Sequence, residues 1–330
     1  MVDVYNLGAV TWVESQSLYH ALAYLNREGL IICYPTSPYV CLGLHDDLEQ
    51  EIDWKYCRDQ GIPLLRRETG GGVVYLDSRQ IFFQLVLRRD NPLVPLCRPL
   101  FFQRFLRPAI SVCRDLGLPA AIKAPADIVV AGRKCSGNGA GDIGQCVAYV
   151  GNILLDFEFE IMSRVLRVPG AVFRQQLEKA MRRYMTTLGE WLGRSPGYAE
   201  LSQALAVAFG RELGELRPRQ PDADLMNCAH KVGARLVSPE WLGAPGRRSR
   251  KRRVKIAEGI YLLEARLAGG RPAVVLVKDG LVEEVSLACG QVDTWADGQA
   301  GSQNQSWGSE LERYVGRPWR EGEEWLAYSQ

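Results

Sequence analysis

A run of three glycines lies between two arginines and a short apolar stretch, and these residue types together could bind an activated acyl group. The run reads, in order, Arg66, Arg67, Glu68, Thr69, Gly70, Gly71, Gly72, Val73, Val74 and Tyr75. Glycines let a ligand approach the main chain, and their amide groups can converge on an oxygen or a phosphate. The arginines can donate charge-assisted hydrogen bonds to a carboxylate or phosphate. The spacing differs from the Rossmann and Walker A glycine patterns. Taken alone, the run is equally consistent with a glycine-rich turn flanked by surface arginines.

A lysine further along the chain could stabilise the charge that develops during acyl transfer. It lies in a second run, Asp127, Ile128, Val129, Val130, Ala131, Gly132, Arg133, Lys134, Cys135, Ser136 and Gly137. Lys134 could neutralise charge on a carbonyl or phosphate oxygen, and Asp127 could steer that lysine or accept a proton from an attacking amine. Strand alternation predicts that Lys134 and Ser136 share one face and that Cys135 points away. Alone, this run favours an exposed hairpin lysine paired with a carboxylate.

Hydrophobic periodicity and turn residues predict the elements that position both runs. Helices are expected over 11–30, 46–60, 98–117 and 171–215, and strands over 31–34, 39–43, 64–67, 73–75, 81–87, 128–137 and 146–157. The run 128–137 would be a hairpin that turns at Gly132, and a polar loop would follow over 138–145. Because both hairpins and helices join these strands, the pattern predicts an α+β fold whose main sheet is mixed or antiparallel and flanked by helices.

Prolines and basic residues interrupt this pattern and divide the predicted fold. We expect a large domain over 1–215, a linker over 216–253 that contains most of a basic run, and a small α+β domain over 254–330. Three strands in the small domain, at 259–265, 273–277 and 281–285, are separated by hairpin-turn residues. They would form a small antiparallel sheet.

The two runs, in this order, resemble the motifs of the lipoate–protein ligase A family. The matching residues are Arg67, Thr69 to Tyr75 and Asp77, then Asp127, Ile128, Gly132 to Lys134, Ser136 and Gly137, then Gly151 to Leu155 followed by Leu166, Val168 and Pro169. The resemblance covers about 1–185, and the segment from Arg253 to Tyr261 is similar to the family's small C-terminal accessory domain. It implies a biotin/lipoate ligase-like fold with a catalytic acyl-adenylate domain and an accessory domain.

The resemblance implies a two-step acyl transfer that uses ATP, Mg²⁺ and lipoate. The carboxylate of lipoate would attack the α-phosphate of ATP, giving lipoyl-adenylate and pyrophosphate. The ε-amine of a lysine on an acceptor lipoyl-domain protein would then attack the carbonyl of the adenylate, leaving an amide and AMP.

The resemblance also implies a role for each matching residue. Lys134 would act electrostatically in both steps, and Asp127 would assist it or the magnesium ion. The expected substrate- and adenylate-binding residues are Arg67, Gly70, Gly71, Gly72, Val73, Val74, Tyr75, Ser136, Gly137 and Gly151. Among them, Arg67 would lie beside the lipoyl tail or carboxylate, and Ser136 and Gly137 would border the nucleotide. The apolar strands would form a tunnel for the dithiolane chain.

Several positions depart from the family pattern and indicate a divergent subgroup. Tyr19 and His20 stand where members usually carry an acidic residue, and Leu44 stands where an arginine is common. Leu76 replaces a histidine, and Val150 falls within a pair of positions that are histidines in the family. The lost polar groups concern nucleotide contact and acceptor choice. The subgroup resembles the ligases associated with bacterial sulfur oxidation, which serve a dedicated lipoate-binding protein.

A cysteine-dependent octanoyl- or lipoyl-transferase is the alternative within the same superfamily. Such an enzyme needs a thiol nucleophile and no ATP, and Cys146 is the nearest candidate. It lies one position before Val147, which aligns with the transferases' cysteine. The loop 123–126, where another transferase type has its nucleophile, contains no cysteine. Cys135 flanks Lys134 but is expected to point away. A biotin ligase would carry a Gly-Arg-Gly-Arg-type loop instead of three glycines.

A non-catalytic module that binds lipoyl proteins or nucleic acid is a further alternative, and the basic run 247–255 is its main support. The chain has a net charge of +2, and the run alone carries seven positive charges, so the remaining residues sum to −5. The positive potential is therefore local. A solvated linker and a docking surface for an acidic lipoyl-domain partner both fit the run. Nucleic acid is the least favoured partner, because no interleaved aromatic residues accompany the charges.

Composition favours a folded protein without a resident metal centre. The 330 residues are 47% hydrophobic and 24% charged, which excludes a disordered chain. Nine scattered cysteines without the C-x2-C spacing, and three separate histidines, predict free thiols and no metal site. No apolar run reaches the ~18 residues needed to cross a bilayer, and no secretory signal opens the chain. We therefore expect a cytoplasmic location and no membrane partner.

Overall fold

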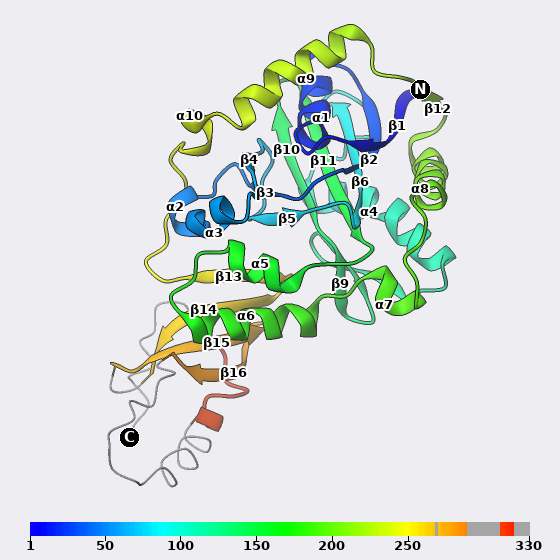
Figure 1. The fold of residues 1–330 in the computed structure, drawn as a ribbon. Coiled ribbons are helices and arrows are strands. Elements are labelled where there is room, and N and C mark those ends of the chain that lie inside the picture. Colours follow the sequence, from blue (N-terminus) through cyan, green and yellow to red (C-terminus); the bar gives the residue numbers. More distant parts are fainter. Residues whose placement is uncertain (268–269, 289–310, 320–330) are drawn as a thin grey trace, which may run out of the picture. The chain divides into compact units, whose positions relative to one another are not determined.

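The computed structural model describes residues 1–267, 270–288 and 311–319, and the chain divides into two compact units (Figure 1). The first unit comprises Met1–Arg167 and Met185–Arg248, and the second comprises Val168–Tyr184 and Ser249–Gln330. The chain passes between the units more than once, because a segment from its middle belongs to the second unit. The catalytic and accessory roles expected for the two domains stay predictions.

A six-stranded mixed sheet forms the centre of the first unit. Its strands are β1 (Val2–Val10), β2 (Gly29–Pro35), β6 (Gln80–Arg88), β10 (Asn138–Ile143), β11 (Cys146–Leu154) and β12 (Leu216–Pro218). They are arranged in the order β10–β11–β6–β2–β1–β12. The pairs β1–β2 and β1–β12 are parallel, whereas β2–β6, β6–β11 and β10–β11 are antiparallel. The prediction of an α+β fold with a mixed sheet is confirmed.

Apolar residues alternate along the central strands and build a core on each face of this sheet. On β6, Phe83 and Leu85 belong to one core, whereas Phe82 and Val86 belong to the other. This alternation follows from the two-residue period of a strand. Because both faces are buried, the central strands are apolar along most of their length, which is why the sequence identified them as strands.

Helices cover both faces of the sheet (Figure 1). The core that contains Phe83 is completed by α4 (Arg98–Asp115) and α8 (Tyr198–Leu213), and the opposite core by α1 (Glu14–Tyr24) and α9 (Ala223–Leu236). The other helices of this unit are short: α2 (Leu48–Glu51), α3 (Trp54–Asp59), α5 (Phe159–Val165), α7 (Leu188–Leu192) and α10 (Pro239–Leu242).

Two three-stranded sheets carry the glycine run and the lysine run. The first consists of β3 (Tyr39–Leu42), β4 (Leu64–Arg66) and β5 (Val74–Leu76), in the order β4–β3–β5. Residues 70–72 form part of its β4–β5 connection. The second consists of β7 (Ala120–Lys123), β8 (Asp127–Val130) and β9 (Arg133–Ser136), in chain order. Ala131 and Gly132, both with positive φ, make the turn between β8 and β9, so the predicted hairpin is confirmed.

In the second unit, the helix α6 (Ala171–Tyr184) packs against an antiparallel sheet. The strands β13 (Arg253–Ala257), β14 (Ile260–Arg266), β15 (Pro272–Lys278) and β16 (Leu281–Leu287) pair in chain order. Ion pairs of Lys179 with Glu284 and of Arg183 with Glu283 join α6 to β16. The predicted antiparallel sheet is confirmed, and the rest of the predicted small domain, at 268–269, 289–310 and 320–330, lies outside the described residues.

Two segments differ from the sequence-based expectation. In the segment 138–145, expected as a polar loop, residues 138–143 form β10, because their main chain pairs in antiparallel register with β11. Its glycines leave no side-chain alternation that could have predicted a strand. The segment 216–253, expected as a linker, contains β12, α9 and α10. Leu225, Ala229 and Leu236 on α9 are buried in the same core as α1, so α9 is part of the packed fold.

The single helix expected over 46–60 is divided into α2 and α3. Asp47 accepts a hydrogen bond from Gln50 N–H at 3.0 Å, and Asp53 accepts one from Tyr56 N–H at 3.1 Å. Each aspartate is therefore an N-cap. The second cap marks a new helix start inside a segment that had been predicted as one helix.

The strands β1 and β7 were also absent from the predicted set.

Candidate active site

The ammonium of Lys134 on β9 is paired with the carboxylate of Asp127, the first residue of β8. Lys134 Nζ lies 2.9 Å from Asp127 Oδ1, and the two side chains are 18% and 4% exposed. The pair spans neighbouring strands of one hairpin, whose register is fixed by the turn at Ala131 and Gly132. A buried carboxylate thus holds the ammonium, while part of the lysine side chain stays open to a ligand.

A β-bulge at Cys135 changes the side-chain alternation expected along β9. Lys134 pairs with Val129 and Ser136 pairs with the adjacent Ile128, so Cys135 is an extra residue on this strand. The prediction that Lys134 and Ser136 share one face is wrong, because their cross-strand partners point to opposite faces. Cys135 lies in the core on the side away from Lys134, as expected, and Ser136 is fully buried.

The segment that follows Tyr184 fixes the main chain of the lysine strand. Lys134 forms a parallel bridge with Met185, and Thr186 N–H donates to Lys134 O at 2.8 Å. Arg133 donates to Met185 O at 2.7 Å and forms an ion pair with Glu190. β9 therefore has backbone partners on both sides, which limits the movement of Lys134.

Arg67 lies against the glycine loop and binds its main-chain carbonyls. Its Nη2 donates to Gly70 O at 2.9 Å and to Gly72 O at 3.0 Å, and its Nη1 donates to Cys41 O at 3.2 Å. The residue is buried, and these acceptors compensate for the loss of hydration of its charge. Arg67 therefore shapes the loop directly. Its expected place beside the lipoyl tail stays a prediction.

Two positions in and around this loop require glycine. Gly71 has φ +100°, and a Cβ there would lie 2.8 Å from Arg67 Nη2. Gly43 packs so closely on the carbonyl oxygen of Gly71 that any side chain would overlap it. Gly71 and Gly72 are exposed, and residues 73–74 are partly buried. The tip of the loop thus presents bare main chain to solvent.

The glycine loop and the lysine hairpin meet the same strand, β10. Gly70 N–H lies 3.4 Å from Ala140 O, and a Cβ on Gly141 would lie 2.9 Å from the Cα of Thr69. β10 begins directly after Gly137, the last residue of the lysine run. This close main-chain packing explains why β10 is rich in glycine. It also attaches two runs that are far apart in sequence to one strand.

Asn152 on β11 holds the corner between β9 and β10. Its Oδ1 accepts from Gly137 N–H at 2.7 Å, and its Nδ2 donates to Gln80 Oε1 at 2.6 Å. Gln80 in turn donates to Tyr75 O at 3.2 Å. Sequence reasoning did not single out Gln80 or Asn152 for a site role. For Asn152 the available signals were an amide side chain on an otherwise apolar strand and its place in the matching stretch Gly151 to Leu155.

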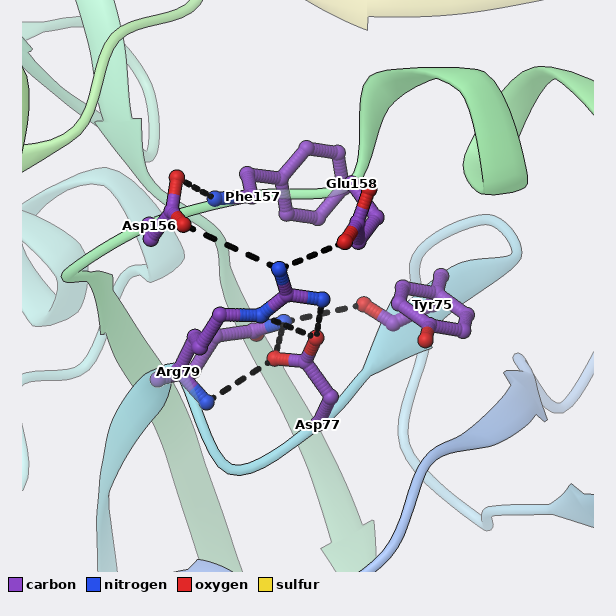
Figure 2. Close-up of polar contacts among 7 residues, drawn as sticks. Tyr75, Asp77, Arg79, Asp156, Phe157 and Glu158 are labelled. Carbon is purple, nitrogen blue, oxygen red and sulfur yellow. Dashed lines mark hydrogen bonds and ion pairs between the residues drawn. The ribbon is translucent and has the colours of Figure 1, made fainter.

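A cluster of charged residues continues this network at the turn between β5 and β6. Arg79 donates to Asp77 at 2.7 Å and to Glu158 at 2.6 Å, and it lies 3.7 Å from Asp156 (Figure 2). Gln80 also approaches Asp77 Oδ1 at 3.4 Å. The cluster joins the β5–β6 turn to the segment before α5. It holds the turn through which the chain passes from β5 in the small sheet to β6 in the central sheet.

Tyr75 and Gly151, two of the predicted substrate-binding residues, lie in packed surroundings. Tyr75 meets the ring of Phe157 edge-on, with centroids 6.4 Å apart, and burial raises its pKa to about 12. A Cβ on Gly151 would overlap the ring of Phe83. The glycine at 151 therefore has a packing reason. Contact of either residue with a substrate stays a prediction.

His20 bridges α1 and the entry to the glycine loop as a neutral side chain. Its Nδ1 donates to Gln16 O at 2.7 Å, and its Nε2 accepts from Glu68 N–H at 3.1 Å. Complete burial lowers the pKa of His20 to about 3, so the ring is uncharged at neutral pH. His20 is thus an uncharged hydrogen-bonding bridge at this position.

The two cysteines considered as nucleophiles are buried thiols. Burial raises the pKa of Cys146, whose Sγ lies 3.6 Å from Asn26 Oδ1. Contact with Cys113, together with burial, raises the pKa of Cys135, whose Sγ lies 3.6 Å from Ile128 O. A reactive cysteine normally has a lowered pKa and some exposure. Neither thiol has these properties in this structure.

Part of the basic run is paired within each unit. In the first unit, Arg248 forms ion pairs with Asp47 at 2.7 Å and with Glu49 at 2.6 Å. In the second unit, the guanidinium of Arg253 lies 4.1 Å from the ring centroid of Tyr261. These contacts give two of the basic side chains structural partners.

The described residues contain no group of three metal-ligating side chains, counting histidine, cysteine, aspartate and glutamate. Across the same described ranges, none of the helices combines the length and apolarity required to cross a membrane.

Comparison with known proteins places these features in a family context. A family model described as the lipoyl protein ligase A/B catalytic domain matches residues 9–210, which include both runs. The lipoate-protein ligase LplJ of Bacillus subtilis is 27% identical over 166 residues, covering 50% of this chain and 49% of that protein. The octanoyltransferase LipM of Symbiobacterium thermophilum is 26% identical over 199 residues, covering 54% of this chain and 72% of that protein. The chain thus spans about half the length of the first of these relatives.

A solved structure supports the same fold. The bi-partite lipoate protein ligase of an archaeal lipoylation system from Thermoplasma acidophilum, described together with its E2 lipoyl domain, aligns with a TM-score of 0.67 and 21% sequence identity. The alignment covers 76% of this chain and 98% of that chain. The predicted biotin/lipoate ligase-like fold is therefore confirmed.

Proposed function

Because this chain belongs to the family of lipoyl protein ligase A/B catalytic domains, we propose that it is a lipoate–protein ligase that activates lipoate with ATP and transfers the lipoyl group to a lysine of an acceptor protein. The predicted resemblance is confirmed for the family, whose members named above include a ligase and an octanoyltransferase. The observation that carries the choice of a ligase is the Lys134–Asp127 pair.

In the first step, a carboxylate oxygen of lipoate attacks the α-phosphorus of ATP, and the bond to the β-phosphate oxygen breaks as pyrophosphate leaves. Both reactants are anions, so their approach requires a positive charge that is already in place. Lys134 would supply that charge. A preorganised charge in a partly buried site stabilises a transition state more than a mobile one in water, and Asp127 and the hairpin keep the ammonium in place.

In the second step, the uncharged amine of an acceptor lysine attacks the carbonyl carbon of lipoyl-adenylate. The bond between that carbon and the phosphate oxygen breaks, AMP leaves, and the nitrogen loses a proton as the amide forms. Lys134 would stabilise the carbonyl oxyanion and the departing phosphate. Asp127 would act as the carboxylate that accepts the proton, a role that a side chain within hydrogen-bond reach can fill.

The two runs would divide the binding of lipoyl-adenylate between them. The exposed main chain at Gly71 and Gly72, shaped by Arg67, would receive the acyl carboxylate and the phosphate. The corner at Gly137 would border the nucleotide, and the fully buried Ser136 would contribute main chain rather than its side chain. Common attachment to β10 supports this division, since it keeps both runs in one part of the fold.

Magnesium belongs to this proposal as a companion of ATP. Mg²⁺ is usually held by one or two carboxylates together with substrate phosphates, and it does not need a cage made by the protein alone. Asp127 is the carboxylate beside Lys134 that would face the metal-bound phosphates. When bound, the ion would neutralise phosphate charge.

The acceptor in this proposal is a lipoyl-domain protein, and the reaction takes place in the cytoplasm. The neighbouring archaeal ligase is described together with such a domain, which supports this class of acceptor. All eight cysteines in the described part of the chain are free thiols, which suits a reducing compartment.

A cysteine-dependent transferase is the second candidate, favoured by the similarity to an octanoyltransferase. In that reaction Cys146 would form a thioester with an acyl group, and ATP would not be needed. The buried Cys146 thiol and its raised pKa argue for the ligase instead.

An ATP–pyrophosphate exchange assay with lipoate, octanoate and biotin side by side tests the proposal. We expect exchange that depends on lipoate or octanoate and no exchange with biotin. Lack of exchange with either fatty acid, combined with acyl transfer from an octanoyl thioester donor, would establish the transferase instead.

A further inference from the structure

The α9–α10 segment lies beyond the family match, which ends at residue 210, yet it packs on α1 and β4. α9 buries its apolar face against α1, and a Cβ on Gly233 would lie 2.6 Å from Val13 Cγ1. Figure 1 shows α9 beside α1 and α10 close to β4, the strand that leads into the glycine loop. The segment is therefore placed to act on that loop.

Arg66, the last residue of β4, is bound by the residues at and after the end of α10. Its Nη2 donates to Leu242 O at 2.6 Å and to Ala244 O at 3.2 Å. In return, Trp241 Nε1 donates to Arg66 O at 2.9 Å. Arg66 is 1% exposed, so these bonds form where water cannot replace them.

Glu68, two residues further on, is bound by α9. Its carboxylate forms an ion pair with Arg235 and accepts a hydrogen bond from Tyr24 Oη at 2.7 Å. The guanidinium of Arg235 lies 5.4 Å from the ring centroid of Tyr24 and 4.9 Å from that of Trp241. Both rings can attract the cation. Arg235 thus links Glu68 to the same tryptophan that binds Arg66.

Arg67 lies between these two residues and points the other way, to the carbonyls of Gly70 and Gly72. The α9–α10 segment therefore fixes the residue on each side of the one that shapes the glycine loop. We propose that Arg235 and Trp241 are positioning residues for the acyl-binding loop, which they hold through Glu68 and Arg66. The part of this inference that the loop binds an acyl group rests on the proposed function. The part that Arg235 and Trp241 hold the loop in place does not.

The test compares four full-length variants with the wild-type protein. Arg235→Gln removes the charge, Arg235→Lys keeps the charge but not the planar group, and Trp241→Phe keeps a ring but removes the Nε1 donor. Arg27→Gln is the matched control, because Arg27 pairs with Asp222 at the start of α9 at 2.8 Å and has no bond to the glycine loop. Thermal unfolding identifies the variants that fold. If Arg235→Gln does not fold, the milder variants Arg235→Lys and Trp241→Phe still test the inference.

Two readouts are measured for each folded variant. Amide hydrogen exchange over 66–73 reports the loop without requiring activity, and ATP–pyrophosphate exchange gives KM for lipoate and kcat. We expect Arg235→Gln to accelerate amide hydrogen exchange in the loop. It should also raise KM for lipoate by roughly tenfold to a hundredfold, because a small displacement of a binding group can have an effect of that size. The change in kcat should be smaller. Arg235→Lys and Trp241→Phe should lie between Arg235→Gln and the wild-type protein, and Arg27→Gln should match the wild type.

The inference would be overturned if Arg235→Gln had the same loop hydrogen exchange and the same KM as Arg27→Gln. The same values in both milder variants, Arg235→Lys and Trp241→Phe, would also overturn it. A different result would contradict the proposed function: a wild-type protein without lipoate-dependent ATP–pyrophosphate exchange would not be a ligase. Loop hydrogen exchange would still decide whether α9–α10 positions the loop.

Discussion

Lys134 and Asp127 gain their importance from burial as much as from charge. An exposed ion pair contributes little, because water and salt screen it. Here the Asp127 carboxylate is only 4% exposed, and it holds the Lys134 ammonium from the neighbouring strand of the hairpin. Removing the lysine would leave a buried carboxylate without this partner, so stability and catalysis must be measured separately.

Lys134→Ala should reduce lipoate-dependent ATP–pyrophosphate exchange by roughly 10²–10³-fold, the usual cost of losing one preorganised electrostatic group. The exchange rate at saturating substrates measures this effect. Lys55→Ala, which removes an exposed lysine paired with Asp59, is the control and should keep the wild-type rate. The double variant Lys134→Ala/Asp127→Asn removes the buried charge and should regain stability without regaining activity. A folded Lys134→Ala protein with near-normal exchange would refute the proposed role.

His20 should make the protein less stable as the pH falls from about 6.5 to about 3. In the unfolded chain the imidazole takes up a proton near its ordinary pKa of about 6.5, whereas burial keeps it neutral in the fold down to a pKa of about 3. Because the unfolded state binds more protons in this window, the free energy of unfolding falls by up to roughly 1.4 kcal/mol per pH unit as the pH decreases.

Denaturant unfolding of the wild-type protein and His20→Gln between pH 7.5 and pH 5 measures this contribution. The variant should lose about 2 kcal/mol less stability than the wild type over that range, while above pH 7 the two pH dependences should be parallel. Equal losses in both proteins down to pH 5 would show that His20 is protonated in the fold.

At the scale of elements, the corner between β9 and β10 depends on a side chain from a third strand. Asn152 on β11 accepts from the Gly137 amide and donates to Gln80, which donates to Tyr75 O on β5. Gly137 O also accepts from Asn152 N–H at 3.1 Å. The corner and the strand β5 after the glycine loop are therefore parts of one hydrogen-bonded network.

Asn152→Ala should lower the free energy of unfolding by about 1–3 kcal/mol, because it leaves the Gly137 amide and Gln80 Oε1 without this partner. Chemical denaturation measures the change. Asn6→Ala serves as the control, since Asn6 makes a single 3.2 Å hydrogen bond to Ser202 away from the corner, and it should cost less. An Asn152→Ala protein as stable as the wild type would mean that water replaces both bonds.

The hairpin of the lysine run could be predicted because its signals are local. The β-branched residues 128–130 predict the first strand, and the turn at Ala131 and Gly132 marks where the second begins. The ion pair between Asp127 and Lys134 follows from the same pairing. The bulge at Cys135 could not be predicted, because it depends on packing against the core and on the bridge to Met185, neither of which leaves a pattern in the run itself.

The surroundings of the glycine loop were predictable only in part. The glycines predicted main chain that a ligand can approach, and Gly71 and Gly72 are exposed, but the sequence gives no sign that Arg67 binds the loop's own carbonyls. β10 escaped detection because its contacts are made by main chain rather than by side chains. α9 was not predicted, because the prolines and charged residues around it indicated a linker rather than an amphipathic helix.

At the scale of the whole molecule, compact units and continuous sequence blocks do not coincide. The family match over 9–210 includes α6, which belongs to the second unit. It excludes α9 and α10, which belong to the first. A residue's position along the chain is therefore a poor guide to which unit it supports.

The same fold accommodates relatives with different named activities, so the fold does not decide between them. The decision depends on particular groups. An ammonium held beside a buried carboxylate suits attack on ATP, whereas transfer through a thioester requires an accessible thiolate. For the candidate cysteines, burial opposes the second chemistry.

Mass spectrometry of a single turnover tests this distinction most directly. The wild-type protein and the variant Cys135→Ser/Cys146→Ser are each incubated with lipoate and ATP, and separately with an octanoyl thioester donor without ATP. We predict lipoyl-adenylate in both proteins with lipoate and ATP, and no acyl group covalently attached to either protein. An octanoyl adduct on Cys146 of the wild-type protein without ATP, with no adenylate under any condition, would contradict the ligase mechanism.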